Sequence, residues 1–136
     1  MITLDTSGLL AAIGQRDPNH FDAIQVLDAD PGPYIIPVAA IAEMASMIET
    51  NFLPAVERAF LDDLLAGTYR FGSGDPDLRR IHHLTQKYDD LPLGFTDAAV
   101  ISCGEQHGGR VLTFDRRYVS VVARGERQFT VLPPVE

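Results

Sequence analysis

Short apolar runs alternate with longer segments of helical periodicity along the whole chain, and this alternation constrains the fold more than any other feature. Five runs have the length and composition of buried strands, and they lie at residues 1–5, 34–36, 69–71, 111–114 and 128–132. Strands that alternate with helices are typical of βαβ units. The sequence therefore predicts one α/β domain over residues 1–136 with a mainly parallel central sheet.

Helix signals between these runs set the expected boundaries. Asp17-Pro18 predicts a helix with Pro18 at its first position, and Thr96 predicts the N-cap of a later helix. The other expected helices cover roughly residues 7–13, 38–50, 54–65, 77–88 and 116–121.

Composition narrows the class of protein. Hydrophobic residues make up 46% of the chain and charged residues 22%, which is typical of a soluble globular domain. The lone Cys103 fits a reducing compartment, and no apolar run reaches the length of a membrane span. We therefore expect a cytoplasmic protein that does not cross a membrane. The net charge of −8 argues against nucleic-acid binding, unless part of the acidity serves a site.

Four acidic residues are placed where a divalent metal site would need them. Asp5 and Asp115 each follow an expected strand, Asp97 lies in the first turn of a helix, and Glu43 interrupts an apolar helix face. Ligands of open α/β sheets gather outside the carboxyl ends of the strands, so these side chains can meet. Such a cluster of negative charge is tolerable only if a cation or protons neutralise it. Carboxylates suit Mg²⁺ or Mn²⁺, which can activate a water to attack a phosphodiester.

Two hydroxyl groups accompany the acids. Ser7 lies two residues after Asp5, and Thr113 lies two residues before Asp115. Each hydroxyl could orient a carboxylate or hydrogen-bond a metal-bound water.

The same residues carry a family resemblance. The matching segments are Ile2 to Ala11, with Asp5-Thr-Ser; Ile41-Ala-Glu43; Tyr88 to Ala98, with Leu-Pro-Leu-Gly-Phe-Thr-Asp97; and Val111-Leu-Thr-Phe-Asp115-Arg-Arg-Tyr. In this order and spacing the chain resembles PIN-domain ribonucleases, and most of all the VapC-type toxins of bacterial toxin–antitoxin pairs.

The resemblance implies a Rossmann-like, three-layer α/β/α sandwich and a Mg²⁺- or Mn²⁺-dependent endoribonuclease. Asp5, Glu43, Asp97 and Asp115 match the family's acidic tetrad, while Ser7 and Thr113 match its accompanying hydroxyl positions. It also implies RNA products with a 5′-phosphate, a homodimer, and a VapB-type antitoxin whose basic C-terminal segment enters the acidic site.

Other residues could contact RNA. Arg116 and Arg117 could bind its phosphates or pair with a neighbouring acid. Tyr88, Phe95 and Tyr118 could stack on bases or pack against the protein.

Other functions stay open at this point. A non-catalytic PIN-like module could use the acidic pocket only to capture a basic partner peptide. A phosphohydrolase with an aspartate nucleophile would want a second acid where Ser7 stands. Taken singly, an aspartate after a strand is most often a turn residue or a helix cap.

Overall fold

The strands of the protein form one parallel sheet. The computed structural model describes residues 1–72, 76–115, 119–126 and 129–134. In these ranges five strands pair in the order β3-β2-β1-β4-β5, and every pair is parallel. The strands are β1 (Ile2–Leu4), β2 (Tyr34–Ile36), β3 (Tyr69–Phe71), β4 (Arg110–Leu112) and β5 (Thr130–Leu132). The predicted α/β class with a parallel sheet is confirmed.

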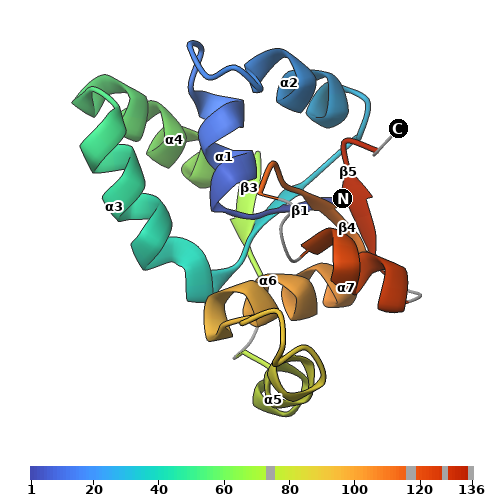
Figure 1. The fold of residues 1–136 in the computed structure, drawn as a ribbon. Coiled ribbons are helices and arrows are strands. Elements are labelled where there is room, and N and C mark those ends of the chain that lie inside the picture. The colour runs from blue at the N-terminus through green and yellow to red at the C-terminus, as the bar shows by residue number, and fades with distance from the viewer. Residues whose placement is uncertain (73–75, 116–118, 127–128, 135–136) are drawn as a thin grey trace.

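The helices cover both faces of this sheet. They are α1 (Thr6–Ile13), α2 (His20–Asp28), the 3₁₀ turn η1 (Val38–Ala40), α3 (Ile41–Asn51), α4 (Pro54–Ala66), α5 (Leu78–Lys87), α6 (Phe95–Gln106) and α7 (Val119–Gly125). The chain moves across the sheet in one direction from β1 through β2 to β3, and in the other direction from β3 to β4 and then β5. Because the crossovers are right-handed, α1–α4 lie on one face of the sheet and α5–α7 on the other. Figure 1 shows these two helix layers with the sheet between them. The three-layer prediction is confirmed.

Two helix starts differ from the sequence prediction. The α2 helix begins at His20 instead of Pro18, because the Asp17 carboxylate accepts a hydrogen bond from the Asn19 amide at 2.8 Å and forms a turn there. The α6 helix begins at Phe95 with Gly94 as its N-cap, so Thr96 lies inside the first turn and is not the cap.

The segment after β2 also differs, and the difference changes which residues are buried. Instead of one helix from Val38, the chain makes the 3₁₀ turn η1 and then α3. A 3₁₀ turn has three residues per turn, so it rotates the helix that follows it. In α3 the buried side chains are Met44 and Ile48, and Glu43 is exposed. The prediction that Glu43 lies in a buried apolar face is wrong.

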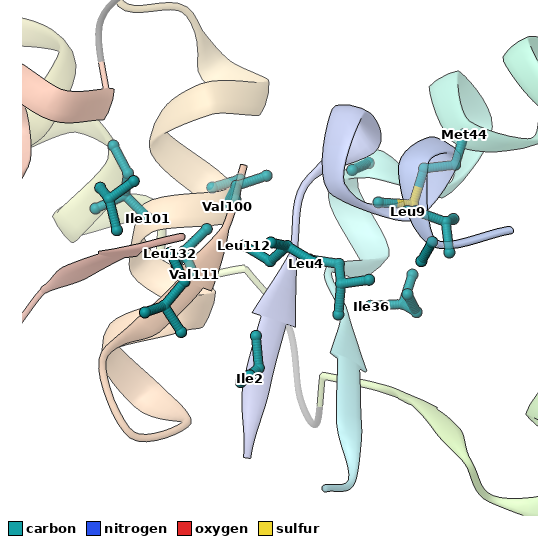
Figure 2. Close-up of a cluster of buried hydrophobic side chains, with 14 of the residues drawn as sticks. Ile2, Leu4, Leu9, Ile36, Met44, Val100, Ile101, Val111, Leu112 and Leu132 are labelled. Carbon is teal, nitrogen blue, oxygen red and sulfur yellow. The ribbon is translucent and has the colours of Figure 1, made fainter. Parts of the chain in front are cut away.

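Apolar side chains from both layers meet the central strands. Leu4 of β1 and Leu112 of β4 are fully buried. Figure 2 shows them between Leu9 and Met44, from α1 and α3, and the α6 residues Val100 and Ile101. The three residues of β1 are all buried, which makes this strand the centre of the core. In the described part of the chain, no helix has both the length and the apolar character of a membrane span.

Candidate functional site

The candidate site lies at the carboxyl ends of the central strands. Asp5 directly follows β1, and Asp115 lies three residues after the end of β4, the strand beside it. Glu43 lies in the first turn of α3, and Asp97 lies in the first turn of α6. Because α6 leads back into β4 antiparallel to the strands, its first turn lies at the same edge as Asp5. The four acids are therefore carried to one edge of the sheet.

Contacts between the helices support this placement. The η1 turn, which immediately precedes α3, contacts α6, and α3 also contacts α1. In Figure 1 the lower end of α3 lies beside the amber N-terminal end of α6. The first turns of α1, α3 and α6 thus border the same region.

Three hydrogen bonds hold the carboxyl group of Asp5. It caps α1, since its Oδ1 accepts hydrogen bonds from the Gly8 amide and the Ser7 hydroxyl, both at 2.8 Å. Its Oδ2 accepts a further hydrogen bond from the Thr113 hydroxyl. Ser7 and Thr113 therefore both hydrogen-bond the Asp5 carboxylate, although Thr113 is close in sequence to Asp115.

The same two hydroxyls connect Asp5 to the segment of Asp115. Ser7 Oγ lies 3.3 Å from Thr113 Oγ1, and it accepts hydrogen bonds from the amides of Phe114 at 2.9 Å and Asp115 at 3.2 Å. Thr113 Oγ1 also accepts from the Asp115 amide at 3.2 Å. A network of two hydroxyls thus fixes the end of β4 against the start of α1.

Gly8 is a residue of this site that the sequence reasoning missed. A Cβ atom at Gly8 would lie 2.3 Å from the carbonyl oxygen of Leu112, so a side chain does not fit between α1 and β4 there. The signal available in the sequence was a glycine three residues after Asp5, at the position whose amide an N-capping carboxylate reaches.

Burial makes the Asp5 carboxyl group a weaker acid than an ordinary aspartate. Loss of solvent raises the pKa of its carboxyl group to about 6, although the hydrogen bonds from Thr113, Gly8 and Ser7 oppose this. The negative charge of Asp115 raises the pKa of Asp5 further. A carboxyl group with this environment is stabilised by any cation that comes near it.

The other three acids differ in exposure. Asp97 is half-buried, whereas Glu43 and Asp115 are exposed. Within residues 1–72, 76–115, 119–126 and 129–134, no three His, Cys, Asp or Glu side chains form a ready-made metal-binding group. The available donors are carboxylate and hydroxyl oxygens, the type that Mg²⁺ and Mn²⁺ prefer, and Glu43 can change rotamer without disturbing the core.

The residues that were candidates for RNA contacts differ in exposure where the structure describes them. Tyr88 is buried and donates its hydroxyl to Glu126 at 2.9 Å, so it packs against the protein. Phe95 is exposed in the first turn of α6. Arg116, Arg117 and Tyr118 lie outside the described residues.

Comparison with known proteins gives the family context. Ribonuclease VapC26 of Mycobacterium tuberculosis is 28% identical over 133 residues, which are 96% of this chain and 98% of that protein. The crystal structure of VapC20 from Mycobacterium tuberculosis, a Sarcin-Ricin loop cleaving toxin, has a TM-score of 0.73 at 17% identity and covers 90% of this chain and 95% of its own. The FitAcB structure from Neisseria gonorrhoeae has a TM-score of 0.65 at 18% identity, with 96% of each chain covered.

A family model confirms the resemblance noted in the sequence. The PIN domain model matches residues 2–124, a range that contains Asp5, Glu43, Asp97 and Asp115. The chain belongs to the PIN domain family.

Proposed function

We propose that this chain is a metal-dependent endoribonuclease and the toxin of a VapBC-type toxin–antitoxin pair. The observation that carries the proposal is the hydrogen-bond network of Asp5, Ser7, Thr113 and the Asp115 backbone at the carboxyl edge of a PIN-domain sheet. The similarity of this chain to Ribonuclease VapC26 over 96% of its length supports RNA as the substrate.

The acidic tetrad would hold the metal ion. Asp5, Glu43, Asp97 and Asp115 offer only hard oxygen donors, which fit Mg²⁺ or Mn²⁺. When bound, the ion supplies positive charge at the scissile phosphate and lowers the pKa of a water molecule.

The protein's own residues prepare this chemistry. Ser7 and Thr113 hold the Asp5 carboxylate in one orientation before any ligand arrives, so little reorganisation is needed at that group. Burial raises the pKa of the Asp5 carboxyl group, so its charged form gains from a nearby cation. Arg116 and Arg117, which follow Asp115 directly, are proposed to contact the RNA phosphates.

Partners follow from the same site. An acidic pocket suits a basic peptide, and we propose a VapB-type antitoxin whose basic C-terminal segment occupies it. A homodimer and a cytoplasmic location complete the proposal.

The experiment is an RNA cleavage assay with purified protein. We expect cleavage with added Mg²⁺ or Mn²⁺, none with EDTA, and at least a hundredfold loss in Asp5→Asn. Asp22→Asn, an exposed acid on α2, is the matched control and should cleave normally. Cleavage that survives EDTA, or products that end in a 2′,3′-cyclic phosphate, would reject the proposal, because such ends mean that the 2′-hydroxyl attacked.

A binding module is the second candidate, and one observation favours it. The described residues contain no ready-made group of three metal-binding side chains, as a site that only captures a basic peptide would allow. Growth arrest on expression separates the two candidates. A nuclease predicts arrest that is lost in Glu43→Gln and kept in Glu49→Gln, an exposed control on the same helix, whereas a binding module predicts no arrest in either.

A further inference from the structure

An aromatic ring is exposed at the edge of the sheet that carries the acids. Phe95 is the first residue of α6, lies two residues before Asp97, and is 52% exposed. The ring of Phe95 is not part of the core, to which α6 contributes buried residues such as Ala98, Val100 and Ile101. This ring is therefore available to contact a ligand at the edge of the sheet that carries the acids.

The surroundings of Phe95 leave room for a flat group. A side chain on the preceding residue, Gly94, would meet no described atom within 4 Å. Gly94 and Phe95 are both exposed at the start of α6, and we call this surface the rim.

Charge explains why such a rim is useful. The chain has a net charge of −8, and its four candidate acids repel a polyanion further. Ordinary nucleic-acid binding depends on neutralising phosphates with Lys and Arg. A contact that is not electrostatic would therefore add to the RNA affinity of a protein with this charge. Stacking of a base on an aromatic ring is such a contact, and it tolerates any base.

We propose that Phe95 is the residue on which a base of the RNA substrate stacks, at the edge of the sheet that carries the acidic tetrad. This proposal rests on the proposed nuclease function, because it supplies the substrate contact for the same site. In this arrangement Phe95 positions the strand and does not read its sequence.

Binding measurements test the role of the ring. We expect Phe95→Ala to weaken binding of a short, mixed-sequence single-stranded RNA about tenfold, and Phe95→Tyr to retain it. Phe95→Leu keeps an apolar side chain but no aromatic face, so it should lose affinity like Phe95→Ala. Phe21→Ala is the matched control, since Phe21 is 70% exposed on α2, in the opposite helix layer (Figure 1).

A fluorescence measurement tests stacking directly. The chain has no tryptophan, so Phe95→Trp introduces a single reporter at the rim and Phe21→Trp introduces one elsewhere. RNA should quench the emission of the Phe95→Trp protein and leave that of the Phe21→Trp protein unchanged. Both titrations are made with EDTA, and again with Mg²⁺ in an Asp5→Asn background, so that neither depends on cleavage.

The outcomes separate this inference from the proposed function. Quenching without any cleavage by the wild-type protein rejects the nuclease and keeps the stacking site. Cleavage by the wild-type protein, together with unchanged emission in both titrations, overturns the stacking site and keeps the nuclease. Phe95→Leu binding RNA as well as the wild-type protein also overturns it, and indicates that the ring serves an apolar protein contact.

Discussion

Burial and hydrogen bonding act in opposite directions on the carboxyl group of Asp5. Burial raises its pKa to about 6, while the hydroxyls of Thr113 and Ser7 and the Gly8 amide stabilise its charged form. Removing one of these donors leaves a partly buried carboxylate with less compensation. The hydroxyls therefore matter more for the state of Asp5 than for the stability of the fold.

Thr113→Val tests the contribution of one hydroxyl group to the state of Asp5. Valine has nearly the same shape but cannot donate to Asp5 or accept from the Asp115 amide, so we expect RNA cleavage to fall about 10- to 100-fold. Thr113→Ser should retain most of the activity because it keeps the hydroxyl. Thr130→Val, at the exposed first position of β5, is the control and should behave as wild type. Equal activity of the valine and serine variants at position 113 would contradict the assigned role.

The sequence was sufficient to predict the part of the site that depends on strand ends. Asp5 and Asp115 were placed beside neighbouring strands from the apolar runs that precede them, and their hydroxyl neighbours followed by position. Glu43 was different, because its burial was inferred from apolar neighbours in a helix assumed to be continuous. The 3₁₀ turn before α3 depends on packing against α6, and periodicity alone does not show it.

At the scale of helices, a cluster of charged side chains holds the end of α7 against α5 and α6. Glu126 follows α7 and accepts hydrogen bonds from Arg80 at 2.7 Å, from Tyr88 and from Lys87. Arg80 also donates two hydrogen bonds to Glu105 of α6, at 3.0 and 2.9 Å. Nothing in the sequence pattern pairs these residues, since Arg80 and Glu126 are far apart along the chain and meet only in the folded protein.

Acid unfolding tests this cluster. Burial alone would raise the pKa of Glu126, but the bonds from Lys87, Arg80 and Tyr88 outweigh it and lower the pKa to about 2. The folded pKa is below the ordinary value of 4.5, so the stabilisation is present above pH 4.5 and is lost as the pH falls toward 2. Urea unfolding across this range should show a steep acid loss in the wild-type protein and a shallower one in Glu126→Gln. Glu49→Gln is the charge control, and the same shallow slope there would reject the assignment.

At the scale of the whole molecule, a bound cation would join segments from both halves of the chain. Asp5 follows the first strand, Glu43 lies in α3, and Asp97 and Asp115 come from the second half of the chain. A ligand that binds only the folded state stabilises it by mass action. A metal-binding tetrad would therefore couple Mg²⁺ directly to global stability.

Unfolding with and without metal tests this coupling. At a hundredfold excess over its Kd, Mg²⁺ should raise the free energy of unfolding by about 2.7 kcal/mol relative to EDTA. Asp5→Asn should abolish this increase. In EDTA at pH 8 the same variant should be about 1–2 kcal/mol more stable than wild type, because an amide is cheaper to bury than a carboxylate. A loss of stability in EDTA, or a full response to Mg²⁺ in the variant, would contradict the tetrad assignment.

The strand order has a consequence for how the protein is made. Because β1 lies between β2 and β4, the first strand to leave the ribosome waits for one of its two neighbours until more than a hundred further residues have been synthesised. Thr113, which holds Asp5, arrives only with that late strand. A nascent chain whose β4 is still inside the ribosome therefore lacks the complete acidic edge.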